Sequence, residues 1–187
     1  MLLARTGYTG EDGFELYVGN DQATPLWGAL LAAGSEKGLI PAGLAARDSL
    51  RLEAGMPLYG NELSLDVTPL EAGLGPVVSL KKEEIFVGRQ AFEAAKAEGR
   101  GTTTGRRLVG LKGLGRRAAR GGYAVLKDGV VVGEVTSGQP SPTLGYPVAL
   151  AMVDVELSEP GTTLDADLRG KAEPFEVVAL PFYQRQK

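Results

Sequence analysis

The stretch that most restricts how this chain can fold is Gly7-Tyr8-Thr9-Gly10-Glu11-Asp12-Gly13-Phe14-Glu15, close to its first residue. Three glycines within seven positions do not suit a helix interior, where each costs roughly 1 kcal/mol relative to alanine. They do suit a turn. Residues 14–18 then alternate apolar and polar side chains, which predicts a strand with Glu15 opposite Phe14. A carboxylate on a strand after a glycine turn is well placed to hold a ligand, although most such clusters are ordinary solvated turns.

Histidine and cysteine are both absent from the 187 residues. The lack of cysteine excludes disulfides, thiol nucleophiles and thiolate metal sites within this chain. The lack of histidine removes the commonest general base and the commonest metal ligand. Any chemistry must therefore use carboxylates, tyrosines, lysines, arginines or a bound reactant, and we expect no metal.

Charge and hydropathy exclude two classes of partner. The formal net charge of −3 leaves no basic surplus for nucleic acid or an anionic membrane. No apolar run approaches the ~20 residues of a transmembrane helix, and Met1-Leu2-Leu3 is too short for the core of a signal peptide. We therefore expect no nucleic acid and no membrane partner, and a location in the cytoplasm, or in the mitochondrial matrix if the source is eukaryotic.

Residues 41–54 predict a helix, with Pro41 in its first turn and Gly55 at its end. Helical spacing places Asp48 in the middle of an apolar stripe, so this carboxylate needs a partner. Arg51 lies three residues further on and can supply one. Arg47 lies at the edge of the stripe, where it either faces a cleft or is an ordinary surface arginine.

From Arg106 onward the pattern is that of an all-β unit. Residues 99–105 are polar and mostly small, which indicates a flexible segment and the best candidate domain boundary. Residues 123–132 predict a hairpin, because Asp128-Gly129 suits a type I′ turn. The sequence thus predicts an α+β fold, with an antiparallel sheet and flanking helices over residues 1–100 and a small barrel or sandwich over residues 106–187.

The opening string GYTGEDGFE resembles the signature of the T protein of the glycine cleavage system, a folate-dependent aminomethyltransferase family. Further segments resemble the same family, in family order, so that the resemblance covers essentially the whole chain. They are AARDSLRLEAG at 45–55, LYGNE at 58–62, TPLEAGLG at 68–75, VTSGQPSP at 135–142 and LPFYQR at 180–185. One departure is Pro76, where family members often have a tryptophan.

This resemblance implies the C-terminal part of a folate-binding α+β domain followed by a C-terminal β-barrel. Family members are about twice as long, so the chain would be the C-terminal half of such a protein. The absent half carries the aspartate regarded as the key catalytic carboxylate, so we expect no catalytic residue in this chain. A separate N-terminal half is then an expected partner.

The resemblance also implies a reaction. In the family, tetrahydrofolate attacks the aminomethyl group carried on the lipoyl arm of the H protein, ammonia leaves, and 5,10-methylenetetrahydrofolate forms. Tetrahydrofolate is thus the expected substrate and the lipoylated H protein the expected partner, and the family needs no metal. The protein's task would be mainly to position the reactants and stabilise charge.

Four residues match family motifs and are carried over as folate- or substrate-binding. Glu15 would accept the adjacent N–H donors of the pterin, and Arg47 would offer a planar fork to pterin acceptors or a carboxylate. Tyr8 would pack its ring beside the folate. Arg185 would reach the cleft from the end of the chain, or it is simply a solvated tail residue.

Three alternatives remain open from the sequence. The chain could be the folate domain of a sarcosine or dimethylglycine dehydrogenase-like enzyme. It could be a non-catalytic folate-binding relative, such as the iron–sulfur maintenance protein with a KGCYxGQ motif, which the absence of cysteine disfavours. It could also be an inert fragment. We expect the isolated chain to bind tetrahydrofolate weakly and to show no turnover.

Overall fold

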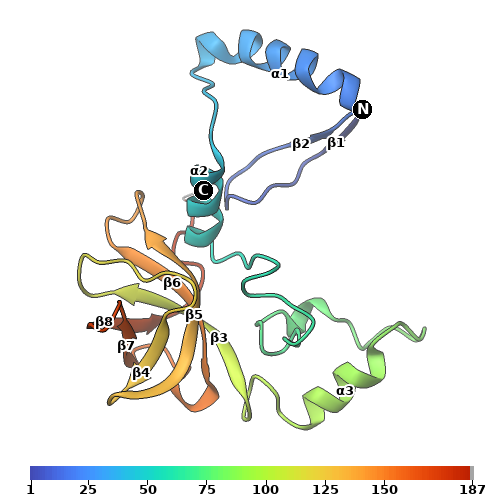
Figure 1. Cartoon of the computed structure of the whole chain (residues 1–187). Coiled ribbons are helices and arrows are strands. Elements are labelled where there is room, and N and C mark those ends of the chain that lie inside the picture. Colours follow the sequence, from blue (N-terminus) through green and yellow to red (C-terminus); the bar gives the residue numbers. More distant parts are fainter. Residues whose placement is uncertain (186–187) are drawn as a thin grey trace.

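The computed structural model describes residues 1–185 as a closed barrel from which a group of helices and strands projects (Figure 1). Gln186 and Lys187, the last two residues of the predicted barrel domain, lie outside the described residues. Ahead of the barrel are two short strands and three α-helices, namely β1 (Leu2–Ala4), β2 (Glu15–Tyr17), α1 (Asn20–Gly34), α2 (Leu44–Glu53) and α3 (Arg89–Ala97). Residues 1–185 contain no helix whose length and apolar character would let it span a lipid bilayer.

The barrel is built from six antiparallel strands in the order β3-β6-β5-β4-β7-β8. Closure leaves its sheet without a free edge. This architecture confirms the predicted α+β class with a C-terminal barrel and decides between the barrel and the sandwich. The strands are β3 (Arg106–Gly113), β4 (Ala124–Lys127), β5 (Val130–Pro140), β6 (Pro147–Asp154), β7 (Thr163–Asp167) and β8 (Ala172–Val178).

The interior of the barrel is apolar and fully enclosed. Val125, Val135, Leu164 and Phe175 come from four different strands and are almost completely buried there. The predicted hairpin is confirmed, because β4 and β5 meet through Asp128 and Gly129, whose φ angles of 53° and 80° suit a type I′ turn. The barrel therefore has both a complete sheet and a complete core.

The part of the chain ahead of the barrel has neither a complete sheet nor a complete core. β1 pairs antiparallel with β2, with Leu3 opposite Leu16, and the two strands form a sheet of their own. Helix α1 follows this sheet and has no buried residue. Figure 1 shows the two-stranded sheet and α1 projecting away from the barrel, with α2 between them and the barrel.

Helix α2 begins later than the sequence predicts. Gly43 is extended (φ −83°, ψ 173°) and serves as the N-cap, so the first helical residue is Leu44 and not Pro41. The end is as predicted, because Gly55 adopts the left-handed conformation (φ 67°) that terminates many helices.

Only the last turn of α2 is seated on the barrel. Arg51, Leu52 and Glu53 are buried, whereas Leu44 at the other end is 85% exposed. Leu52 packs in a cluster with apolar residues of β3 and β6, which are Leu108, Val148 and Leu150. The barrel thus fixes the position of α2 through one end of the helix.

Candidate functional site

The buried side chain of Arg51 is the centre of a polar network at the end of α2. Its guanidinium donates to Asp48 Oδ1 over 2.8 Å, to Glu62 Oε2 over 3.1 Å and to Ser137 Oγ over 2.8 Å. The predicted pairing of Asp48 with Arg51 is confirmed. The predicted burial is reversed, because the Asp48 side chain is 50% exposed and that of Arg51 is 2% exposed. The reason is that the last turn of α2, and not its middle, faces the barrel.

Glu62 balances the charge of Arg51 inside the molecule. Its carboxylate is completely buried, and Oε2 also accepts a hydrogen bond of 2.8 Å from the backbone N–H of Leu58. Among the described residues, Glu62 Oε1 has no hydrogen-bond partner. Because a buried charge needs a counter-charge, this ion pair holds α2 and the segment at 57–58 in a fixed relation.

That segment in turn holds Tyr8 of the glycine loop, which we define as residues 7–13. The Tyr8 hydroxyl donates to the carbonyl oxygen of Pro57 over 2.5 Å, and the guanidinium of Arg47 lies 5.3 Å from the centre of the Tyr8 ring. Burial raises the pKa of the Tyr8 hydroxyl, and the nearby positive charge of Arg51 opposes this effect. The structure thus brings two of the four predicted site residues into contact.

The glycine loop lies against the end of α2 because two glycines make room for it. Gly10 has a φ angle of 76°, and a Cβ atom there would lie 2.9 Å from the Cβ of Ala54. At Gly55, a Cβ atom would lie 3.2 Å from the side chain of Leu180. The glycine loop, the end of α2 and the C-terminal segment therefore meet around Ala54 and Gly55.

Arg185 also contacts the glycine loop. It forms an ion pair with Asp12, with a distance of 2.5 Å between Nη1 and Oδ2. The neighbouring Tyr183 donates its hydroxyl to Glu11 Oε1 over 2.6 Å, which raises the pKa of Tyr183. The acidic pair of the glycine loop thus holds the end of the described chain.

Glu15 lies at the start of β2, where its partners are local. Oε2 accepts a hydrogen bond of 2.5 Å from the Thr6 hydroxyl and a longer one of 3.4 Å from Tyr17. Neither donor is one of the other three predicted site residues. The contacts of residues 1–185 therefore join Tyr8 to Arg47 and Arg185 to the glycine loop. The binding roles of all four residues stay a prediction.

Comparison with known families agrees with this arrangement. Residues 1–82 match the family model for the GCVT N-terminal domain, and residues 106–184 match that for the glycine cleavage T-protein C-terminal barrel domain. The chain belongs to the glycine cleavage T-protein family. The limits of the two predicted domains, at residues 100 and 106, stay a prediction.

Individual T-protein relatives match the chain over its full length. The aminomethyltransferase of Streptomyces coelicolor is 60% identical over 187 residues, and that of Bacillus velezensis is 49% identical. In both cases the match covers 100% of this chain and 50% of the relative. The crystal structure of glycine cleavage system aminomethyltransferase T from Bartonella henselae is similar with a TM-score of 0.89 and 38% identity, over 97% of this chain and 49% of that one. The chain spans about half the length of these T-protein relatives.

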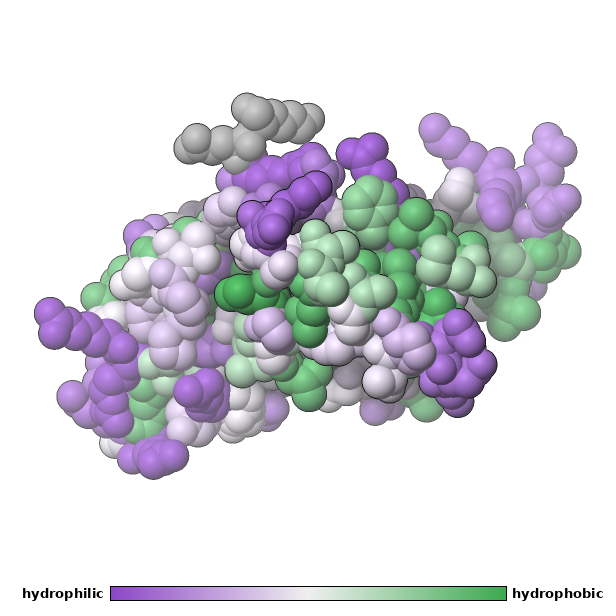
Figure 2. All heavy atoms as spheres, turned by 90° about the horizontal axis from the view of Figure 1, so that it is seen from above, coloured by the Kyte–Doolittle hydropathy of each residue, from purple (hydrophilic) through white to green (hydrophobic). Residues whose placement is uncertain are grey.

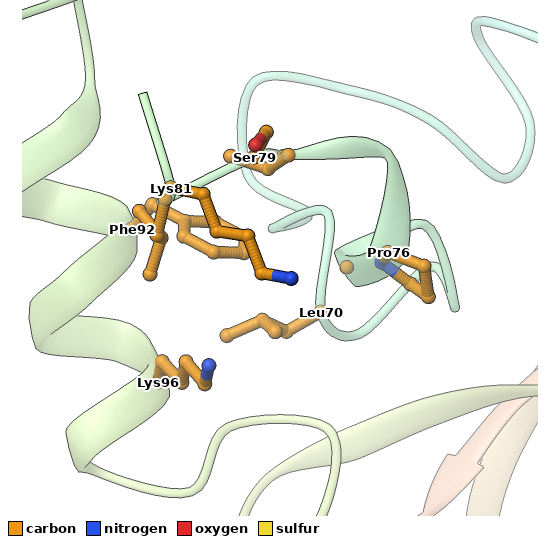
Figure 3. A pocket seen from close by; sticks show the side chains of 9 residues that line it. Leu70, Pro76, Ser79, Lys81, Phe92 and Lys96 are labelled. Atoms are coloured by element: carbon orange, nitrogen blue, oxygen red, sulfur yellow. The ribbon is translucent and has the colours of Figure 1, made fainter. Parts of the chain in front are cut away.

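A separate hollow lies beside Pro76. It has a volume of about 610 Å³ and lies between α3 and the 3₁₀ turn at Gly75–Val77, where this chain has Pro76. Figure 3 shows Phe92 in its wall and the amines of Lys81 and Lys96 beside it. None of the four predicted site residues lines this hollow.

Several residues that shape the candidate site were not predicted from the sequence. Asp12 and Glu11 hold the C-terminal segment, and Glu62 holds the segment that anchors Tyr8. An acidic pair between two glycines is a signal that could have identified the first two. Glu62 had no comparable signal, because its partner Arg51 was already assigned to Asp48.

Proposed function

We propose that this chain supplies the folate-facing loop, the α2 helix and the barrel of a folate-dependent aminomethyltransferase. In the reaction, the carbon carried by the lipoyl arm of the H protein exchanges its bonds to nitrogen and sulfur for bonds to N5 and N10 of tetrahydrofolate. The two protons lost from those folate nitrogens leave on ammonia and on the lipoyl thiol. The products are then 5,10-methylenetetrahydrofolate, ammonia and the reduced lipoyl arm. The observation that carries the proposal is 60% identity to a named aminomethyltransferase along the whole chain.

The contact between Arg47 and Tyr8 supports a binding role for this corner of the molecule. A guanidinium over an aromatic ring gives a flat, partly cationic surface, onto which a planar pterin or a folate carboxylate can pack. The network of Arg51 and Glu62 fixes both partners, Arg47 through α2 and Tyr8 through Pro57. The surface would thus be preorganised before the ligand binds, which lowers the entropy cost of ordering these side chains on binding.

Glu15 and Arg185 would make further contacts with the ligand. The Glu15 carboxylate would accept the paired N–H donors of the pterin, after exchanging the Thr6 hydroxyl for them. Arg185, held by Asp12, would face the folate or the lipoyl arm. The aspartate expected to stabilise the departing ammonia belongs to the part of the family protein that this chain does not contain. We place the reaction in the cytoplasm, or in the mitochondrial matrix if the source is eukaryotic.

The relatives named above are aminomethyltransferases, which favours this reaction over that of a sarcosine or dimethylglycine dehydrogenase. The test is to fuse the 187 residues behind the unmatched residues of the Streptomyces coelicolor protein and to measure ammonia and methylenetetrahydrofolate with aminomethylated H protein. We expect turnover by the fusion and none by the isolated chain. An inactive but well-folded fusion, nanomolar folate binding by the isolated chain, or full activity of that chain would contradict the proposal.

A further inference from the structure

The closed barrel carries a small hollow of its own, which is lined by three arginines. Its volume is about 170 Å³, and the residues around it are Arg117, Ala118, Arg120, Tyr123, Leu168 and Arg169. We call it the arginine hollow. Its lining includes no carboxylate, although the chain as a whole has a net charge of −3. Like charges around one space repel one another, and an anion placed between them is attracted by all of them.

The arginine hollow belongs to the part of the molecule that has a complete sheet and core. Its arginines come from the loop between β3 and β4 and from the turn between β7 and β8. Figure 2 shows hydrophilic side chains projecting on the barrel side of the molecule, whereas hydrophobic ones gather on the face on which α1 lies. None of the four predicted folate- or substrate-binding residues lines the hollow. The proposed function therefore leaves it without a role.

The loop that carries Arg117 and Arg120 is packed tightly on the barrel. Ala119, between them, is fully buried in the barrel core. A Cβ atom at Gly138 of β5 would lie only 2.6 Å from the carbonyl oxygen of Ala119, so the loop backbone contacts the strand directly. The two arginines thus extend from a backbone that is fixed before any ligand binds, which lowers the entropy cost of binding.

Arg169 occupies a backbone conformation that does not favour arginine. Its φ angle is 61°, in the left-handed region that glycine and asparagine tolerate best. The turn is held on both sides of it, because Leu168 is buried in the core and the Gly170 N–H donates to Asp167 Oδ1 over 2.5 Å. An arginine kept at such a position indicates that its side chain has a task there.

Two of the guanidiniums have hydrogen-bond donors to spare. Arg120 donates from Nη1 to the carbonyl oxygen of Gly138 over 3.2 Å, and Arg169 donates from Nε to the hydroxyl of Tyr123 over 3.3 Å. A guanidinium has five N–H groups, so most of them stay available. Within residues 1–185, neither arginine forms an ion pair.

The nearby carboxylates do not neutralise the arginine hollow. Glu173 Oε1 lies 3.4 Å from Nη1 of Arg117, but it also lies 3.1 Å from Nζ of Lys171. One negative charge is therefore shared between two positive ones. Asp167 accepts the backbone N–H of the β7–β8 turn. The charges of Arg120 and Arg169 thus remain without a paired carboxylate inside the described chain.

We propose that the arginine hollow binds a phosphate group, either as the free ion or as the phosphate of a larger molecule. The planar fork of a guanidinium matches the oxygens of phosphate, and several positive charges favour a dianion over a single carboxylate. The Tyr123 hydroxyl accepts from Arg169 and can donate its own proton to a phosphate oxygen. The hollow is smaller than the roughly 300–1,000 Å³ of pockets that enclose whole drug-sized ligands. It would therefore hold the anionic group and leave any organic remainder in solvent.

The test is isothermal titration calorimetry of the 187-residue chain with sodium phosphate, methyl phosphate and sodium acetate. Sodium chloride keeps the ionic strength constant, because non-specific attraction of anions is screened by salt. We expect saturable one-to-one binding of phosphate or methyl phosphate, and binding of acetate weaker by about tenfold or more. Tighter binding of phosphate would identify the free ion as the ligand, and tighter binding of methyl phosphate would identify the phosphate group of a larger molecule.

Two substitutions locate the site. Arg169→Asn should weaken phosphate binding by about tenfold or more, the usual effect of losing a charged hydrogen-bond donor, and Arg120→Gln should do the same. Asparagine tolerates the left-handed backbone, so Arg169→Asn should keep or raise the melting temperature while it lowers affinity. The matched control is Arg107→Gln, which removes an exposed arginine of β3 outside the hollow and should leave the affinity unchanged.

Phosphate should also raise the melting temperature of the natural chain and have a much smaller effect on Arg169→Asn, because a ligand stabilises only the fold that binds it. Circular dichroism of each variant shows whether its fold is intact.

Four results would overturn the proposal. They are the absence of saturable binding by either phosphate, acetate binding as tight as that of phosphate, an equal loss of affinity in Arg107→Gln and Arg120→Gln, and unchanged affinity in both Arg120→Gln and Arg169→Asn. None of these measurements needs folate, H protein or turnover. A failure of the proposed reaction would therefore leave this result standing, and the reverse is also true.

Discussion

Arg51 on α2 donates a 2.8 Å hydrogen bond from Nη2 to the hydroxyl of Ser137 on β5, across 86 positions of sequence. A second bond joins α2 to the residue that follows β5, because the Ser141 hydroxyl donates to Glu53 Oε1 over 2.5 Å. Together they fix the last turn of α2 to the barrel. Arg47 lies one turn earlier on the same helix, so the barrel sets where the guanidinium of Arg47 meets the ring of Tyr8.

Replacing Arg51 by methionine should lower the free energy of unfolding by about 3–5 kcal/mol, because Glu62 would be left buried without its counter-charge. Urea denaturation of the chain measures the loss. The matched control is Arg106→Met, which breaks a half-exposed pair with Asp154 and should cost about 1 kcal/mol or less. Adding Glu62→Leu to Arg51→Met should recover much of the loss. Equal effects of the two arginine substitutions would show that the network around Arg51 is not essential.

Replacing Gly10 by alanine should displace the glycine loop from α2. The new Cβ would combine backbone strain at a φ angle of 76° with a 2.9 Å approach to Ala54. The control is Gly122→Ala, with a φ angle of 85° but nothing within 4 Å of the added carbon. We expect Gly10→Ala to destabilise the chain by about 1–3 kcal/mol more than the control does. If the two variants unfold at the same urea concentration, crowding against Ala54 is unimportant.

Replacing Glu15 by alanine in the full-length fusion should weaken tetrahydrofolate binding by roughly 1–3 kcal/mol, the usual effect of losing a charged hydrogen-bond acceptor. Isothermal titration calorimetry measures the dissociation constant. Glu134→Ala removes an exposed carboxylate from β5 of the barrel and should have no effect on it. An unchanged dissociation constant for Glu15→Ala would remove Glu15 from the folate site.

The raised pKa of Tyr8 predicts a loss of stability at alkaline pH. Above the ordinary value of 10.0, the unfolded phenol has lost its proton while the folded one still holds it. Unfolding then releases a proton, so rising pH favours the unfolded state, and the loss continues until the folded phenol ionises as well. Between about pH 9 and about pH 11, the urea midpoint should therefore fall more steeply for the natural chain than for Tyr8→Phe. If the urea midpoints of the natural chain and of Tyr8→Phe fall equally with pH, the folded environment does not raise the pKa of Tyr8.

The features that the sequence predicted are those fixed over short separations. The Asp128-Gly129 turn follows from the backbone angles those residues tolerate, and the pair of Asp48 with Arg51 follows from helical spacing. The predicted start of α2 was wrong, because the helix begins at Leu44 after the extended N-cap Gly43, and not at Pro41. A glycine can adopt either a helical or an extended conformation, so its local sequence did not decide between them.

The features that the sequence did not predict depend on long-range packing. Tyr183 bonds to Glu11 across 172 positions, and no periodicity within either segment indicates that partner. The exposure of Leu44 was equally unpredictable, because a helical stripe shows which face is apolar and not whether the described chain covers it. For the candidate site, motif resemblance predicted Tyr8, Glu15, Arg47 and Arg185, whereas the groups that hold them become apparent only in the folded structure.

The seating of α2 on the barrel also has a consequence for biosynthesis. Ser137 and Ser141 are translated well after Arg51 and Glu53, so the helix has no permanent anchor while the ribosome is still making the barrel. Domains generally fold as units as they emerge from the ribosome. The barrel can therefore close by itself, and α2 can pack on it only afterwards. Until that moment the nascent chain displays Leu52, which the closed barrel later buries, and this interval is therefore the natural point for a chaperone to intervene.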